Sequence, residues 1–126
     1  MNLKETSLTG FRIVVSAIFI IHGIARSLIY KTVDGFGEFL DSKGFVFGLI
    51  IAWFITVFEI VGGLTMATGK YVSYIAIGFV IHQVMGIVLV HAQNGWFVVG
   101  ASTGGVEYSV LIIASLLLLA AFHRKN

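Results

Sequence analysis

The stretch that decides the fold is "YVSYIAIGFVIHQVMGIVLVH", residues 71–91. It runs for 21 residues without one Asp, Glu, Lys or Arg, and a helix needs ~20 apolar residues to cross ~30 Å of hydrocarbon. Because lipid offers no hydrogen-bond partner to backbone N–H and C=O groups, a segment that crosses it must be helical. This stretch therefore predicts a membrane-spanning helix.

Three further apolar segments surround it, at about residues 8–30, 45–68 and 105–122, and the last is near the short limit for a span. The loops between them are short, so consecutive helices should run antiparallel. We therefore predict an all-α fold, a polytopic membrane protein whose residues 1–126 form one domain. Its architecture should be a four-transmembrane-helix up-down bundle.

The composition supports lipid as the solvent of this chain. Hydrophobic residues make up 58% and charged residues 11%, with a mean hydropathy of +1.00, whereas soluble domains carry roughly 25% charged residues. There is no cysteine, which excludes disulfide exchange, thiolate metal sites and cysteine nucleophiles. The basic residues stand singly at segment ends, without a basic stripe, so we expect no nucleic-acid partner.

The basic residues also indicate an orientation, because short cytoplasmic loops carry an excess of Lys and Arg. One side of the predicted bundle holds more basic residues, namely Lys4, Arg12, Lys70, Arg124 and Lys125. The other side holds Lys31 and Lys43, with Arg26 if it is counted. We expect a multi-pass protein of the plasma membrane with both termini in the cytoplasm. Cleavage of the first segment as a signal peptide is the disfavoured alternative, because the segment is long and lacks a clear cleavage site.

The first outer loop, "KTVDGFGEFLDSKGF" at residues 31–45, has the pattern of a short amphipathic helix. Phe36, Phe39 and Leu40 recur at helical spacing, and acidic residues take other positions. We expect this helix to lie in the outer membrane interface. An ordinary loop that dips its phenylalanines into the headgroups is the alternative.

Ionisable side chains inside spanning segments are costly, so each is a functional hypothesis with a partner to be named. They are Arg12, His22, Arg26, Glu59, His82, His91 and Glu107. From the cytoplasmic edge Arg12 lies ~6 Å deep and Glu59 ~14 Å deep at ~1.5 Å per residue. We therefore predict a structural ion pair between Arg12 and Glu59. Small residues predict close helix packing at Gly62, Gly63, Gly78 and Gly86.

The remaining polar residues fall in the predicted outer half of the membrane. His22 and Arg26 are four residues apart and share a helix face, while His91 and Asn94 end the third segment. Glu107 opens the fourth segment, where the helix dipole favours a carboxylate, and Ser102 and Thr103 are expected to cap that helix. Together with Tyr108 these residues predict a polar pocket near the outer leaflet. The alternative is that buried polar residues only stabilise the bundle.

Three motifs give the chain a family resemblance: "HGIAR" at 22–26, "FEIVGG" at 58–63, and "HAQNGWFVVG" with "GGVEYS" at 91–100 and 104–109. They resemble the DoxX-like family of small four-helix prokaryotic membrane proteins. The positions that match are Arg12, His22, Gly23, Arg26, Glu59, Gly62, Gly63, His91, Asn94, Gly95, Glu107 and Tyr108. The chain departs from the family in having no proline in the first outer loop. The resemblance implies a redox-associated membrane protein, since the family is similar to a membrane subunit of thiosulfate:quinone oxidoreductase.

Two functions follow from this interpretation. In the first, the chain is a quinone-linked membrane subunit in which His22, Arg26, His91, Asn94, Glu107 and Tyr108 bind a quinone headgroup. Glu107 and Arg26 are the candidates for proton transfer. The chain has no electron carrier of its own, so a partner redox protein or a haem held by His22 and His82 is required. In the second, it is a non-catalytic anchor or assembly subunit. We predict no metal site, and either a redox partner or a homo-oligomer in the bilayer.

Overall fold

The computed structural model describes residues 1–123, and all regular secondary structure in this range is helical. The chain divides into two compact units, Met1–Lys70 and Tyr71–Asn126. The all-α prediction is therefore confirmed for the described residues. Arg124 and Lys125, which entered the predicted orientation, lie outside them.

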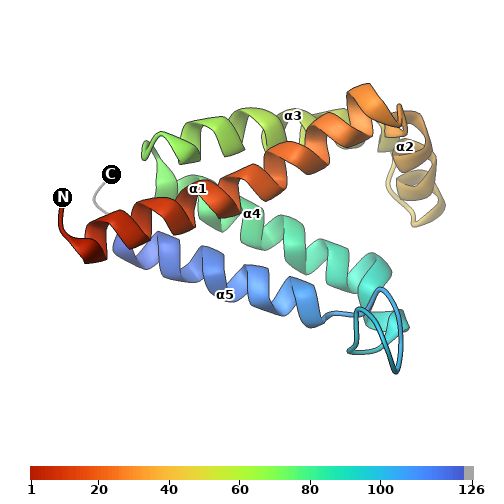
Figure 1. Cartoon of the computed structure of the whole chain (residues 1–126). Helices are drawn as coiled ribbons and strands as arrows, with labels where there is room; N and C mark the ends of the chain where they lie inside the picture. The colour runs from red at the N-terminus through yellow and green to blue at the C-terminus, as the bar shows by residue number, and fades with distance from the viewer. Residues whose placement is uncertain (124–126) are drawn as a thin grey trace. The chain divides into compact units, whose positions relative to one another are not determined.

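The first unit consists of two long helices joined through a short one (Figure 1). Helix α1 spans Leu3–Ile24 and continues as a π-helical turn, η1, over Ala25–Ile29. Helix α2 spans Val33–Ser42 and α3 spans Gly48–Ala67. Helix α1 begins before the predicted residue 8, because the side chain of Asn2 accepts a hydrogen bond from Glu5 N at 2.9 Å and caps the helix. Hydropathy alone does not detect a polar cap of this kind.

Helices α1 and α3 pack antiparallel through two glycines. A Cβ at Gly23 of α1 would lie 3.1 Å from the backbone oxygen of Thr56, and one at Gly63 of α3 would lie 3.1 Å from that of Ser16. Each glycine thus brings its helix against the backbone of the other, as small residues do between membrane helices. This close approach sets the register in which polar side chains of the two helices meet.

Helix α2 forms the short helix that was expected in the first outer loop. It packs on the start of α3, where a Cβ at Gly37 would lie 2.8 Å from Leu49 Cα. The carboxylate of Asp41 accepts a hydrogen bond from Gly48 N at 2.9 Å and joins the two helices again. Val33 and Leu40 are buried and Phe36 is half-buried, so one face of the amphipathic helix is covered. Its position in a membrane interface stays a prediction.

The second unit is a pair of antiparallel helices with an irregular connection. Helix α4 spans Val72–Gly86, continues as the π-helical turn η2 over Ile87–His91, and ends in a 3₁₀ turn, η3, over Ala92–Asn94. Helix α5 spans Glu107–Phe122. The hydroxyl of Ser73 donates to Ala120 O at 2.7 Å, which places the start of α4 beside the end of α5.

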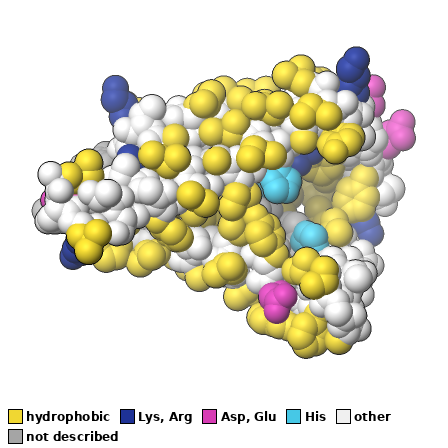
Figure 2. Space-filling model, viewed as in Figure 1, with side chains coloured by type: hydrophobic (Ala, Val, Ile, Leu, Met, Phe, Trp, Pro, Cys, Tyr) yellow, Lys and Arg dark blue, Asp and Glu magenta, His cyan; other side chains and the backbone are white. Residues whose placement is uncertain are grey.

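Three of the four predicted spans are long and apolar enough to cross a membrane: Leu3–Ile29, Gly48–Ala67 and Val72–Asn94. Helix α5 is apolar but shorter, with 16 residues. Figure 2 shows apolar side chains over much of the visible surface. The exposed apolar side chains of α3 include Ile50, Phe54, Val57, Val61 and Leu64. Such a surface fits lipid as the surrounding medium.

Candidate functional site

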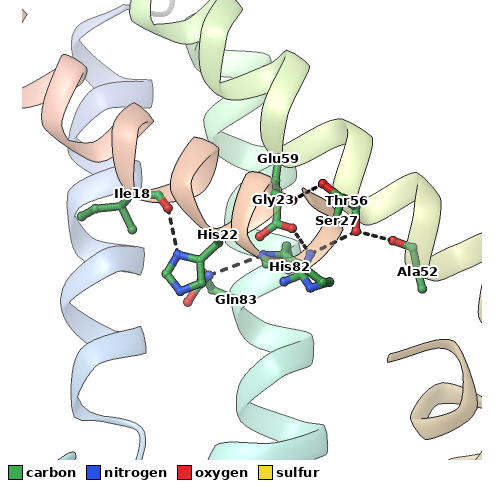
Figure 3. A network of polar contacts seen from close by, with 10 residues as sticks. Ile18, His22, Gly23, Ser27, Ala52, Thr56, Glu59, His82 and Gln83 are labelled. Carbon is green, nitrogen blue, oxygen red and sulfur yellow. Dashed lines mark hydrogen bonds and ion pairs between the residues drawn. The ribbon is translucent and has the colours of Figure 1, made fainter. Parts of the chain in front are cut away.

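The most distinctive site in the first unit is a salt bridge between Arg26 of η1 and Glu59 of α3. The Glu59 side chain is only 2% exposed, and it meets the Arg26 guanidinium through Nη1. The same Nη1 donates to Thr56 Oγ1 at 3.2 Å, and the Thr56 hydroxyl donates to Ala52 O at 2.8 Å. Figure 3 shows Glu59 and Thr56 in this network. A buried carboxylate is thus paired and hydrogen-bonded inside an apolar helix pair, as burial of a charge requires.

The sequence analysis predicted that Glu59 pairs with Arg12, whereas in the structure it pairs with Arg26. Arg12 lies further along the helix pair, where its Nη2 donates to Ala67 O at 3.3 Å. Ala67 is eight residues from Glu59 on α3, which is ~12 Å along a helix at ~1.5 Å per residue. Arg26 has Thr56 as its neighbour, only three residues from Glu59. The prediction used only the estimated depth of each residue from one membrane edge. Which residues pair depends instead on the register between the two helices.

The π-helical turn η1 carries Arg26, and sequence analysis did not detect it. Its wide turn is closed by a hydrogen bond from Tyr30 N to Ala25 O at 2.8 Å. Tyr30 is followed by Lys31 at φ 54°, a left-handed conformation that is rare for a residue with a side chain. Single π-helical turns inside α-helices occur frequently at functional sites. The sequence between His22 and Lys31 holds no proline that could have signalled the turn.

The side chain of Phe36 covers Arg26 from α2. The guanidinium carbon lies 4.9 Å from the centre of the Phe36 ring, within the range of a cation–π interaction. The Arg26 side chain is nevertheless 19% exposed. Arg26 thus contacts residues of both α2 and α3 and keeps part of its surface accessible. Thr56 and Phe36 are site residues that the sequence analysis did not include, because neither is ionisable.

The histidine of the first unit is held by its own helix. His22 Nδ1 lies 2.8 Å from Ile18 O, and because a carbonyl oxygen only accepts, the proton of this bond is on Nδ1. His22 is exposed on α1. Its Nε2 is then the ring nitrogen that can meet a ligand, as an acceptor in the neutral ring or as a donor in the cation.

A second histidine is held in the same way in the second unit. His91 Nδ1 donates to Gly104 O at 2.7 Å, and Asn94 Nδ2 lies 3.4 Å from the same oxygen. Asn94 Nδ2 also lies 3.3 Å from Val90 O. The carbonyl of Gly104 is therefore shared by two of the predicted site residues. This contact fastens the connection between η3 and α5 to the end of η2.

That connection, residues 95–106, is folded by its own hydrogen bonds. Gly105 N donates to Phe97 O at 3.0 Å and Glu107 N donates to Trp96 O at 2.9 Å. The hydroxyl of Ser102 accepts from Phe97 N at 3.1 Å and donates to Phe97 O at 3.0 Å. Ser102 therefore closes the loop and does not cap α5, whose N-cap residue is Val106 without a side-chain bond. The expected cap by Ser102 and Thr103 is wrong, because residues 104–106 lie between them and the first residue of α5, Glu107.

The remaining predicted residues lie as follows. Glu107 and Tyr108 are exposed in the first turn of α5. His82 is half-buried, with its Nδ1 3.4 Å from Gln83 Nε2. Gly86 has room for a methyl group, since the nearest atom to an added Cβ is His91 Cδ2 at 3.8 Å. Within residues 1–123, no group of three or more His, Cys, Asp and Glu side chains is arranged to hold a metal ion.

The structure therefore brings the predicted residues together in two sets. Arg26 meets Glu59 in the first unit, and His91 meets Asn94 at Gly104 in the second. The single pocket predicted from the sequence stays a prediction; its residues are His22, Arg26, His91, Asn94, Glu107 and Tyr108.

Comparison with known proteins identifies a family. The family model described as DoxX matches residues 7–92, which is more than half of the chain. The matched range includes Arg26, Glu59 and His91, whereas the connection 95–106 and α5 lie beyond it. No curated protein and no solved structure matches the chain.

Proposed function

The chain belongs to the DoxX family of membrane proteins, and on this basis we propose that it is a quinone-linked, redox-associated membrane subunit. The observation that carries the proposal is the Arg26–Glu59 salt bridge. An ionised pair inside apolar helices is expensive, and ionisable groups at such positions are functional by default. Helix packing alone does not need it, because Gly23 and Gly63 already join α1 to α3.

The two fixed histidines supply ligands of the kind that a quinone headgroup needs. His22 and His91 each have Nδ1 bound to a backbone carbonyl, so each ring is oriented and offers Nε2. A protonated Nε2 donates to a quinone carbonyl, and a neutral one accepts the proton of a quinol hydroxyl. Tyr108 is a further donor, whereas Asn94 offers its side-chain oxygen as an acceptor, because its Nδ2 already faces Val90 O and Gly104 O. Glu107 exchanges the protons of two-electron reduction, and Arg26, which keeps its own proton, supplies a positive charge.

The same proposal includes the topology and the partners of the protein. Four helices cross the plasma membrane, both termini lie in the cytoplasm, and the site opens toward the outer leaflet. Helix α5, with 16 residues, spans ~24 Å at ~1.5 Å per residue, so the bilayer must thin or polar flanks must extend the span. Electrons come from a partner redox protein or from a haem, because Cys, a ligand of iron–sulfur clusters, is absent from the sequence.

A second function has one observation in its favour. The salt bridge links Arg26 of η1 to Glu59 of α3, and the bond from Nη1 to Thr56 Oγ1 strengthens that link. An anchor or assembly subunit would need only this stabilisation. It would bind no quinone, and substitutions at the pair would lower its stability alone.

Purification in mild detergent followed by solvent extraction separates the two functions. We expect the wild-type protein to carry quinone, and His22→Ala and His91→Ala to lower the amount of quinone per folded chain. The matched controls are Ile21→Ala, at an exposed neighbour of His22, and Gln93→Ala, at an exposed residue near His91. A visible spectrum of the same samples reports haem. Wild-type protein without quinone, or full retention in both histidine variants, would overturn the proposed pocket.

A further inference from the structure

The Arg26 side chain has donors that the protein does not use. Both of its hydrogen bonds, to Thr56 and Glu59, start at Nη1. An arginine side chain carries five N–H donors, of which three are on Nε and Nη2. Those three have no acceptor among residues 1–123, and the side chain is 19% exposed. One edge of the guanidinium is therefore ready for an acceptor from outside the chain.

The charge of this edge is already balanced. Glu59 sits against Nη1 and carries the opposite charge, so the pair is neutral as a whole. An anion that reached Arg26 would meet the field of the Glu59 carboxylate and lose most of the attraction. An uncharged acceptor, such as a carbonyl oxygen, keeps its hydrogen bonds to Nε and Nη2 without that repulsion. The pair therefore selects against charge in the ligand.

Phe36 limits the shape of the ligand. The guanidinium carbon of Arg26 lies over its ring, 4.9 Å from the ring centre, so an aromatic surface borders the unused donors. The ring is held there because α2 is attached to α3 through Gly37 and through the Asp41–Gly48 hydrogen bond. A flat ring that enters along this edge can lie against Phe36 while its oxygen meets Nε and Nη2.

We propose that Arg26, Glu59 and Phe36 form a binding site for the uncharged carbonyl oxygen of a planar ring. The inference rests on the proposed function and deepens it. Arg26 donates the hydrogen bonds, Glu59 cancels the charge and thereby sets the preference for a neutral ligand, and Phe36 positions the ring. Phe36 and Glu59 are specificity-determining residues in this site.

The first experiment tests the preference for a neutral ligand in protein reconstituted in phosphatidylcholine nanodiscs. The probes are an alkyl-substituted benzoquinone and a benzoate with the same alkyl chain, each titrated separately. We expect the wild type to bind the quinone more tightly, and Glu59→Gln to move the ratio of the two dissociation constants about tenfold or more toward benzoate, because the Arg26 charge is no longer balanced. An unchanged ratio would overturn the inference. So would displacement of the quinone by phosphatidylglycerol in the wild type, which would make Arg26 a site for lipid phosphate.

The second experiment tests Phe36 with a matched control on the same helix. Phe39 is also half-buried on α2, and its ring lies 5.5 Å from Lys43 Nζ, away from the Arg26 contact. We expect Phe36→Leu to weaken quinone binding about 3-fold or more, and Phe39→Leu to leave it unchanged. Equal effects of the two substitutions would show that Phe36 has no special part in the site.

The outcomes separate this inference from the proposed function. If the wild type binds no quinone, both fail. If it binds quinone and neither Glu59→Gln nor Phe36→Leu changes the affinity or the selectivity, only this site is refuted. Should Glu59→Gln not fold, the preference of the wild type for quinone over benzoate and the comparison of Phe36 with Phe39 decide the question.

Discussion

A methyl group at Gly23 tests whether the contact of α1 with α3 holds the site together. In Gly23→Ala the new carbon would lie 2.6 Å from Ile60 Cγ1 and 3.1 Å from the backbone oxygen of Thr56. The isoleucine side chain can turn away, but the Thr56 carbonyl moves only if the helices separate. Overpacking of this kind costs about 1–3 kcal/mol, whereas the gain in helix propensity over glycine is about 0.5–1 kcal/mol. Subtracting this gain from the cost gives an expected net loss of up to about 2.5 kcal/mol.

Gly10→Ala is the matched control on the same helix, because nothing lies within 4 Å of a Cβ at that position. It should gain the same helix propensity, about 0.5–1 kcal/mol, without the clash. The difference between the two variants then isolates the overpacking term of about 1–3 kcal/mol. Thermal unfolding in one detergent, followed by circular dichroism, gives this difference. Equal stability of Gly23→Ala and Gly10→Ala would refute the close approach of α1 to α3.

Three further predictions follow from single contacts. Removing one partner of the salt bridge by Arg26→Gln or Glu59→Gln should lower the free energy of unfolding by about 3–5 kcal/mol. The double variant should lose less than the sum of the two single losses, and a double-variant loss equal to that sum would exclude a direct interaction. His91→Ala removes the bond to Gly104 O, so amide exchange at Gly104 and Gly105 should rise about 5-fold or more by mass spectrometry, whereas Gln93→Ala should leave it unchanged. Asp41→Ala removes the acceptor of Gly48 N and should lower the free energy of unfolding by about 1 kcal/mol, measured by thermal unfolding. An equal loss in Glu38→Ala, at an exposed residue of the same helix, would contradict the role of Asp41.

The helical architecture follows from the apolar segments because lipid leaves the backbone no other partner. The stretch at 71–91 predicts a spanning helix from its composition, and the structure has apolar helix over Val72–Asn94. The short helix α2 is also predictable from the sequence, since Phe36, Phe39 and Leu40 recur at helical spacing. The membership in the DoxX family is predicted from short motifs and is confirmed over residues 7–92.

The site was only partly predictable. Arg26, Glu59, His91 and Asn94 are recognisable as polar residues in an apolar chain, because such residues must find partners. Which partner each one finds depends on the separation of two helices along their axes. The loop at 95–106 is harder still, since its bonds join backbone groups that every residue carries.

What the sequence determined by itself is therefore the class of structure and the identity of the residues that cannot face lipid. Only the tertiary structure decided that Glu59 meets Arg26, through the contact of Gly23 with the Thr56 backbone. It also decided that the turn at Ala25–Ile29 is π-helical, and that Phe36 covers the guanidinium. The physical reason is that hydropathy is a property of one segment alone. A salt bridge depends on the register between two segments, and their packing sets that register.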